Sequence, residues 1–375
     1  MNKKRNIHAL HLTQFLTLII FLFFIFLFTI VNLFAPKLSF SANENRPLAS
    51  FPNSSLQNIF FGSFDTEFEK WFSDHFVGRD HWIEMKANTR LDLSAIENNG
   101  VYIGKDGHLI SQFYDYDLTT KENNISFVLD FAKQNNIKMN ILLVPGAAYG
   151  EEKYLPFGAY NINEKELIDS IYEDFNNNGQ KTIDISDALK NSEDSYFKTD
   201  HHYNHKGAYI AYQAICDEVL KKEALNFNYT EVSPTFYGTM YSRSGIFSTK
   251  PDAIYEMKAT PLEVEVSYDD GTVTHSLFAE EKLKEKDKYT YYLGGNHAYV
   301  HIKTNANTKK KAIVIKDSFA HILLPYLAYE YDEIHVFDLR YYREAISKTL
   351  EKNMDVYLIY GVETFVTDPG LAGLW

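Results

Sequence analysis

The feature that most limits how this chain can fold is a long apolar stretch near its N-terminus. Between Ala9 and Ala35 there is no Lys, Arg, Asp or Glu, and Leu, Ile and Phe dominate the run LTLIIFLFFIFLFTIVNLFA. At a helical rise of 1.5 Å per residue, this length is sufficient to cross a hydrocarbon core of about 30 Å. We therefore predict a transmembrane helix over residues 9–35.

The flanking residues predict the orientation of that helix. Three basic residues at 3–5 precede it, and basic flanks tend to stay in the cytoplasm. We expect residues 1–8 to be cytoplasmic, the helix to be an uncleaved single-pass anchor, and the polar segment 36–50 to be an extracytoplasmic stalk. The alternative is a cleaved signal peptide, which has a shorter apolar core and a small-x-small cleavage site. The stretch SFSAN at 39–43 is a poor candidate for such a site.

Composition excludes some classes of function for the rest of the chain. The 375 residues carry a formal net charge of −13, so no basic field would attract nucleic acid. The single cysteine, Cys216, lies in a helical pattern and is predicted to be part of the core. One cysteine can form neither an internal disulfide nor a zinc-thiolate cluster.

Helical and strand patterns alternate after residue 51, which predicts an α/β domain over 51–375. Helices are expected at 63–98 with a break at Gly78, at 121–136, at 163–176 and after residue 204. Strands are expected in VYIGKDGHLI, NNIKMNILLVPG, KTIDIS, KKKAIVIK, EIHVFDLR and DVYLIYGV. Residues 226–308, rich in Tyr, Thr and Val, are predicted to form a β-rich insertion that makes a lid or a cleft wall, with tyrosines suited to stacking on sugar rings.

The segment AIVIKDSFA, residues 312–320, offers a candidate nucleophile. An apolar strand precedes Ser318, and we predict a helix from about 319 to 331. Open α/β sheets bind ligands at the carboxyl ends of their strands, and a helix N-terminus favours a developing oxyanion. The alternative is that Asp317 or Ser318 only caps the helix.

The stretch KTDHHYNHKGAY, residues 198–209, offers a base and a group to orient it. If it is extended, Asp200 and His202 share a face and His201 points away. Asp200 could then accept the Nδ1–H of His202, leaving Nε2 free to take a proton from Ser318. Asn204 is a suitable N-cap for the helix that follows.

Two other roles for these histidines remain open at this point. His201 and His205 are four residues apart, which would suit zinc on one helix face, but the glutamate of an HExxH motif is missing. The helix would also have to begin before His201. The histidines could alternatively be purely structural.

TDHHY followed by HKGAY resembles the block that names the DHHW family of exported proteins, which are similar to the alginate O-acetylation proteins. Other blocks fit the same pattern, namely ENRPLASFP, WFSDHFVGRDHW, VYIGKDGHLI, ILLVPG, FYGTMYSRSG, GGNHAY, IKDSFAHILLPYL and VFDLRYY. The resemblance implies an SGNH-hydrolase-like three-layer α/β sandwich. It also implies a catalytic triad of Asp200, His202 and Ser318.

The sequence departs from the family pattern at two positions. Tyr203 stands where the family name has tryptophan, a change expected to preserve packing. Lys316 stands where SGNH enzymes usually have glycine, which puts their usual oxyanion arrangement in doubt. Asn296 of the GGN block is a candidate oxyanion donor and Arg340 a candidate substrate contact, although both could be loop or salt-bridge residues.

Together these observations lead us to expect a membrane-anchored, extracytoplasmic O-acetyltransferase of a secreted or cell-wall polysaccharide, acting through an acyl-serine. The resemblance implies a membrane-bound O-acyltransferase as the partner that supplies acetyl groups, and neither a cofactor nor a metal is expected. A polysaccharide acetyl-esterase is the alternative enzyme. A non-catalytic polymer-binding or scaffold protein is the alternative outside enzymes, and the substitution at Lys316 favours it.

Overall fold

The computed structural model describes residues 2–374, with side chains from Leu12 onward. Met1, Trp375 and the basic side chains at 3–5 therefore lie outside the described part. The chain forms two compact units that divide after Thr89, whereas the sequence led us to begin the folded domain at residue 51. Each unit is described separately.

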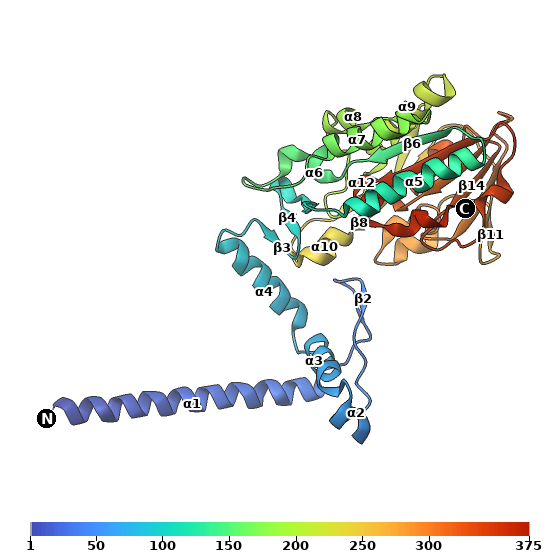
Figure 1. Ribbon diagram of the computed structural model, residues 1–375. Helices are drawn as coiled ribbons and strands as arrows, with labels where there is room; N and C mark the ends of the chain where they lie inside the picture. Colours follow the sequence, from blue (N-terminus) through green and yellow to red (C-terminus); the bar gives the residue numbers. More distant parts are fainter. Residues whose placement is uncertain (1, 375) are drawn as a thin grey trace. The chain divides into compact units, whose positions relative to one another are not determined.

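The first unit begins with the long helix α1 (Asn2–Phe34), drawn in blue in Figure 1. Its segment Leu12–Phe34 is long and apolar enough to cross a membrane, and a signal sequence would have the same properties. The unit also contains β1 (Phe40–Ser41), β2 (Arg46–Pro47), α2 (Leu56–Phe61), α3 (Phe64–Asp74) and most of α4 (Arg79–Asp92).

Two details of this unit differ from a simple stalk and a continuous helix. The strands β1 and β2 pair as a hairpin within the segment 36–50. The Arg46 guanidinium of this hairpin donates to both oxygens of Asp74, at 3.0 and 2.5 Å. The expected break at Gly78 is present, because Gly78 has φ +69° between α3 and α4. Helix α4 ends at Asp92, so the predicted extension of the helix to residue 98 is wrong.

The second unit is built on a mixed sheet. Within residues 2–374 it has eight strands, in the spatial order β11 (Val273–Thr274), β10 (Val264–Tyr268), β12 (Tyr299–Thr304), β14 (Glu333–Phe337), β13 (Lys311–Lys316), β15 (Asp355–Gly361), β6 (Met139–Val144) and β7 (Lys181–Ile183). The strands from β14 to β7 are parallel, and β12, β10 and β11 continue the sheet in antiparallel pairing. The strands predicted in this region are confirmed.

Helices cover both faces of this sheet (Figure 1). One face packs against α5 (Leu118–Gln134), α7 (Glu164–Asn177) and α12 (Val362–Thr367). The other face packs against α9 (His205–Ile215) and α11 (Leu324–Leu327). The parallel strands are apolar on both faces, as a strand between two helical layers must be. The predicted three-layer α/β sandwich is confirmed, and Cys216 is buried in its core.

The β-rich segment 226–308 is only partly a separate structure. Strands β8 (Asn228–Phe236) and β9 (Asp252–Lys258) pair with each other, but β10, β11 and β12 belong to the central sheet. Tyr289, Tyr291 and Tyr292 are buried. The expectation that tyrosines of this segment stack on sugars is therefore wrong for these three, because their rings fill the core.

Short elements complete the unit. They are β3 (Glu97–Asn98), β4 (Val101–Ile103), η1 (Lys105–Gly107), β5 (Leu109–Ser111), α6 (Ala147–Gly150), η2 (Glu152–Tyr154), α8 (Ser186–Lys190), η3 (Cys216–Leu220), α10 (Thr239–Ser244), η4 (Glu280–Lys284), η5 (Lys288–Tyr291), η6 (Ser318–Ala320), η7 (Ile346–Thr349) and η8 (Pro369–Gly373). The helix expected over 319–331 is replaced by η6 and α11. Pro325 lies in the first turn of α11, where a residue without an N–H is tolerated but cannot continue a helix from before it.

Candidate active site

Ser318 lies two residues after the carboxyl end of β13, at the first position of η6. Asp317 before it accepts hydrogen bonds from the N–H groups of Phe319 and Gly361, each at 2.9 Å. Asp317 is therefore the cap of this turn. The hydroxyl of Ser318 is left free for another partner, and that partner is His202.

His202 connects the serine to a carboxylate. Its Nε2 lies 2.8 Å from the Ser318 Oγ, and its Nδ1 lies 2.6 Å from the Asp200 Oδ1. Because a carboxylate only accepts, Nδ1 carries the proton and Nε2 accepts from the serine hydroxyl. The ring of Tyr289 stacks on His202 with centroids 3.9 Å apart and an interplanar angle of 6°. The Tyr289 hydroxyl donates to the Ser318 carbonyl at 2.8 Å, so one side chain positions both residues.

Asp200 is buried and held at both oxygens. Its Oδ2 accepts from the N–H and the hydroxyl of Thr239, at 2.8 and 3.0 Å, and its Oδ1 also accepts the His202 N–H at 3.1 Å. Burial alone would raise the pKa of Asp200. The charges of His201 and His202, together with these hydrogen bonds, instead hold that pKa well below its ordinary value. The carboxylate is therefore ionised at neutral pH.

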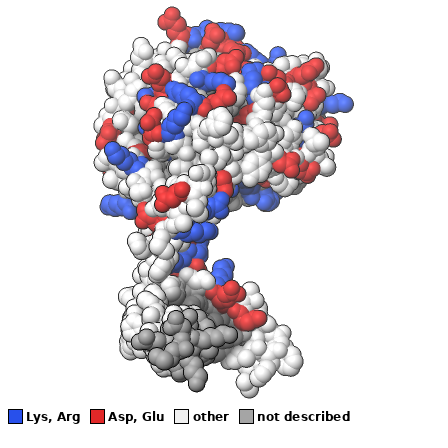
Figure 2. All heavy atoms as spheres, turned by 90° about the vertical axis from the view of Figure 1, so that its left-hand side faces the viewer, with Lys and Arg blue, Asp and Glu red and all other residues white. Residues whose placement is uncertain are grey.

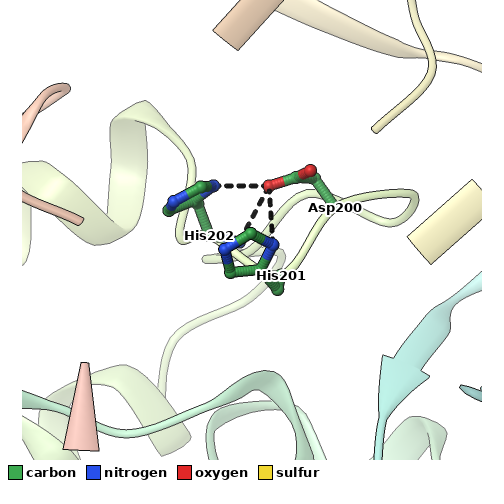
Figure 3. Close-up of side chains that lie close together, drawn as sticks. All are labelled: Asp200, His201 and His202. Carbon is green, nitrogen blue, oxygen red and sulfur yellow. Dashed lines mark hydrogen bonds and ion pairs between the residues drawn. The ribbon is translucent and has the colours of Figure 1, made fainter. Parts of the chain in front are cut away.

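His201 does not point away from this group as the sequence led us to expect (Figure 3). Residues 198–202 form successive bends rather than an extended strand. The His201 Nδ1 consequently lies 3.6 Å from the Asp200 Oδ1 and 2.7 Å from the Thr239 Oγ1. Its imidazole is 3.8 Å from that of His202 between ring centroids.

His205 and His201 do not form the pair that a helical zinc site would need. His205 begins α9, where its ring packs against Tyr229 and Tyr255 at 5.0 and 4.3 Å. The predicted N-cap of α9 is confirmed, since the Asn204 Oδ1 accepts from Lys206 N–H at 2.8 Å. Ligand atoms of Asp200, His201 and His202 do lie within 4.8 Å of one another. A metal there would have to displace the bond between His202 and Asp200.

Lys316, the substitution that raised doubt about catalysis, is buried beneath the turn. Its Nζ donates to the Asp338 Oδ2 at 2.9 Å and to the His321 Nε2 at 2.7 Å. Burial lowers the pKa of Lys316, and the Asp338 carboxylate opposes that effect. Among the described residues, the Lys316 side chain bonds to neither Ser318 nor His202.

Asn296 and Arg340 lie beside each other, with the Arg340 Nη2 3.4 Å from the Asn296 Oδ1. Arg340 is bound mainly to Asp338, through Nε at 2.8 Å and Nη2 at 2.6 Å. It therefore has the salt-bridge role that was the alternative to substrate contact. Asn296 is exposed, and its amide NH₂ makes no hydrogen bond within residues 2–374.

The backbone offers a second candidate for an oxyanion donor. The Phe319 N–H is occupied by Asp317, but the Ser318 N–H has no hydrogen-bond partner in the described part of the chain.

Two positioning residues, Thr239 and Tyr289, were not predicted from the sequence. Thr239 lies within the FYGTMYSRSG block that carried the family resemblance, whereas no local signal marks Tyr289 among many tyrosines.

A pocket borders the site on the side of Asp200 and His201, and it is lined also by Phe319, Glu164 and Glu363. Glu164 is buried, and its Oε2 accepts the Gly146 N–H at 2.6 Å. Burial raises the pKa of Glu164 to about 7. Among the side chains that the structure describes, this carboxyl group has neither a histidine nor a basic partner, unlike Asp200 and Asp338.

Comparisons with known proteins agree with this architecture. Residues 157–337 match the family described as DHHW protein. A DHHW family protein from Eubacterium siraeum aligns with a TM-score of 0.64 and 23% identity, over 74% of this chain and 97% of that one. Bacillus cereus PatB1, solved with a sulfonyl adduct, aligns with a TM-score of 0.57 and 20% identity, over 71% and 96%. The O-acetyltransferase domain of Pseudomonas putida AlgJ aligns with a TM-score of 0.46 and 14% identity, over 71% and 92%.

A search of curated proteins finds no match to this chain. The structural likeness to the E. siraeum protein and to PatB1 establishes the fold. The similarity of this chain to the DHHW family, which its sequence blocks indicated, is confirmed.

Proposed function

We propose that this protein is a membrane-anchored, extracytoplasmic O-acetyltransferase that modifies a secreted or cell-wall polysaccharide. The observation that carries the proposal is the line from Asp200 through His202 to Ser318, with contacts of 2.6 and 2.8 Å. Such a line activates a serine hydroxyl by giving its proton a place to go. The similarity to DHHW proteins supports the same class of reaction.

The proposed chemistry has two acyl-transfer steps. In the first, the Ser318 Oγ attacks the acetyl carbonyl of a donor while its proton moves to the His202 Nε2. Asp200 stabilises the imidazolium, and His202 then gives the proton to the leaving group, so that an acetyl-serine remains. In the second, a sugar hydroxyl gives its proton to His202 and attacks the acetyl-serine, and His202 then returns the proton to the departing Ser318 Oγ, which restores the serine. The N–H of Ser318 and the amide of Asn296 are the candidate donors to the oxyanion.

The proposed location outside the cytoplasm rests on the apolar segment Leu12–Phe34 of α1 and on the basic residues 3–5 that precede this segment. No acetyl-CoA is present there, so an acetyl group must cross the membrane. A multi-spanning membrane-bound O-acyltransferase is the proposed supplier. On the face drawn in Figure 2, acidic and basic side chains are interspersed over the larger unit, which suits a neutral polymer better than nucleic acid.

The acetyl-esterase alternative uses the same acetyl-serine, with water as the acceptor. The scaffold alternative drew its support from Lys316. That support is weaker because the Lys316 ammonium is bound by Asp338 and His321.

The test uses the full chain in detergent with a chromogenic acetyl ester, with and without an oligosaccharide acceptor. We expect intact mass spectrometry to detect one acetyl group on Ser318, and we expect acetylated oligosaccharide as product. Release of the chromophore that is unaffected by acceptor, with no acetylated oligosaccharide, would indicate an esterase. Absence of both adduct and turnover would support the scaffold.

A sulfonyl fluoride provides an independent probe of the serine, because such reagents capture activated hydroxyl groups. We expect one adduct per chain, and none in Ser318→Ala. Ser126→Ala is the matched control, since Ser126 is an exposed serine on α5. Labelling that persists in Ser318→Ala would contradict the assignment of the nucleophile.

A further inference from the structure

A second cluster of metal-ligand side chains lies outside the site described above. His108 follows η1, Glu151 follows α6, and Asp194 lies in the loop that leads to Asp200. One potential ligand atom from each of the three lies within 4.8 Å of the others. His108 and Glu151 are each only 1% exposed, so their polar atoms are removed from water.

The hydrogen bonds of His108 fix its protonation pattern. Its Nδ1 lies 3.0 Å from the Lys105 carbonyl oxygen, which can only accept, so Nδ1 carries a hydrogen. The neutral ring then presents a lone pair at Nε2, and the Glu151 Oε2 lies 3.2 Å from it. Neither atom has a hydrogen-bond partner among the described residues. Two buried acceptors that face each other repel, so a cation is required between them: either a second proton on His108 or a metal ion.

The geometry favours the metal ion. The contact between Nε2 and Oε2 does not meet the geometry of a hydrogen bond, since both atoms remain unpaired at 3.2 Å. Two ligand atoms at about 2.1 Å from one ion, and 3.2 Å from each other, subtend about 100° at that ion, which suits tetrahedral or octahedral coordination. One imidazole and two carboxylates would also neutralise a divalent charge.

Each candidate ligand is oriented by a further contact, as is usual around bound metals. The Tyr154 hydroxyl donates to the Asp194 Oδ1 at 3.2 Å, and the Tyr196 N–H donates to the Glu151 Oε1 at 3.2 Å. The ring of Tyr154 stacks on His108 with centroids 3.7 Å apart. These contacts leave the His108 Nε2 and the Glu151 Oε2 as the free ligand atoms.

We propose that His108, Glu151 and Asp194 bind a divalent transition-metal ion of the Zn²⁺ type. Imidazole nitrogen together with carboxylate oxygen suits Zn²⁺ better than Ca²⁺, which takes oxygen ligands. Asp194 lines an open groove together with Asp106 and Gly107, which gives an ion a path to the site.

The ion would stabilise the loop that supplies the triad. The Asp194 carbonyl accepts from the Asn204 Nδ2 at 2.7 Å, and Asn204 caps α9 two residues after His202. The ion would thus join the segments of His108 and Glu151 to Asp194, which lies at the start of the loop that carries Asp200 and His202. Its role is structural and does not depend on the reaction proposed above.

The experiment uses the full chain in detergent, stripped with a chelator and dialysed against Zn²⁺. We expect about one Zn²⁺ per chain by elemental analysis, and a rise in Tm of about 5 °C at a hundredfold excess over Kd. Ca²⁺ should produce neither effect. Glu151→Gln and His108→Ala should abolish stoichiometric binding, and Asp194→Asn, at a partly exposed position, should weaken it at least about tenfold.

His301→Ala is the matched control, because His301, Glu333 and His335 form another cluster of similar composition. This variant should retain the bound Zn²⁺. Loss of Zn²⁺ in His301→Ala, retention in Glu151→Gln, or no binding by the unaltered chain would each overturn the proposal. Nitrogen NMR that finds both ring nitrogens of His108 protonated in the presence of Zn²⁺ would also overturn it, in favour of an ion pair.

Discussion

Two buried imidazoles, those of His202 and His321, stack on the Tyr289 ring, and their Nε2 atoms have different partners. His202 stacks on this ring at 3.9 Å and His321 at 5.9 Å between centroids. The Nε2 of His202 lies against a neutral hydroxyl, that of Ser318. The Nε2 of His321 lies 2.7 Å from the Lys316 ammonium.

The difference shows that a histidine and a carboxylate near a strand end do not by themselves make a base. Lys316 only donates, so it occupies the lone pair of His321 and leaves the ring proton on Nδ1. Burial and the neighbouring Lys316 charge hold the pKa of His321 well below its ordinary value. The Nδ1 of His202 binds the Asp200 carboxylate, and its Nε2 accepts from the Ser318 hydroxyl. This is the arrangement that general-base catalysis requires.

The largest expected effect tests this contrast directly. His202→Ala should reduce acetyl transfer at least about 10³-fold, because the serine proton then has no acceptor. His321→Ala should reduce it less than about tenfold. Both variants are measured by initial rates with the chromogenic ester, alongside thermal unfolding to establish that each is folded. Equal losses in two folded variants would break the comparison and give His321 a part in the reaction.

The carboxylates of Asp200 and Asp338 also differ in their partners. Asp200 binds the His202 imidazole, whereas Asp338 binds the Lys316 ammonium. Asp338→Asn should lower the free energy of unfolding by about 3–5 kcal/mol, because it leaves the buried Lys316 without its counter-charge. The double change Lys316→Met with Asp338→Leu should recover most of that loss, since it removes both charges together. Urea unfolding of the unaltered chain, Asp338→Asn and the double variant measures how much of the loss is recovered. A double variant no more stable than Asp338→Asn would contradict the ion-pair explanation.

Asp200→Asn tests the other carboxylate of this comparison, the one that binds His202. We expect a loss in acetyl transfer of about 10³- to 10⁴-fold, because an amide no longer fixes the proton on the His202 Nδ1. Its effect on turnover should exceed that of Asp338→Asn by at least about tenfold. Initial rates of the two variants at a temperature where both remain folded provide the measurement.

The sequence alone was sufficient to predict contacts between residues that are close in the chain and the position of Ser318 near the end of a strand. The cap at Asn204 follows from local spacing, and the α/β alternation predicts the layers. The pairing of Asp200 with His202 was also predicted, although from an extended conformation that bends at 198–202 replace. The contact of His202 with Ser318 joins residues 116 positions apart, so the sequence suggested it only as the base that a nucleophilic serine needs, and the family resemblance implied it as part of a triad. The structure has it at hydrogen-bonding distance, and its catalytic role stays a prediction.

The failures have a physical cause in longer-range contacts. His201 was misplaced because Thr239, on another segment, binds Asp200 and bends the loop. Lys316 raised doubt about catalysis because the sequence does not show its partner. That partner, Asp338, follows the carboxyl end of β14, 22 residues later in the chain. The tyrosines were assigned to sugar binding because composition does not distinguish buried rings from exposed ones.

Glu164 extends the comparison to a carboxyl group that, among the described side chains, has neither an imidazole nor a basic partner. Its pKa is raised by burial from 4.5 to about 7, so the folded chain keeps a proton that the unfolded chain has lost. Its contribution is fully present below about pH 4.5 and disappears as the pH rises toward 7. Glu164→Gln should remove this dependence, so relative to the unaltered chain it should gain about 2.5 kcal/mol between pH 5 and pH 8.

Urea unfolding at the two pH values gives this difference, and Glu166→Gln, at an exposed position on the same helix, is the control. If Glu164→Gln and Glu166→Gln change equally with pH, burial of Glu164 is not the cause.

The smallest expected effect concerns the hydroxyls of two tyrosines: Tyr203, which follows His202 in the chain, and Tyr289, which stacks on His202. The Tyr203 hydroxyl is buried without a hydrogen-bond partner among residues 2–374, whereas that of Tyr289 donates to the Ser318 carbonyl. Tyr203→Phe should therefore raise the free energy of unfolding by about 1 kcal/mol, and Tyr289→Phe should lower it by about the same amount. Urea unfolding of both variants checks the opposite signs. A loss in Tyr203→Phe would mean that its hydroxyl has a partner, such as a bound water, in the loop that carries the base.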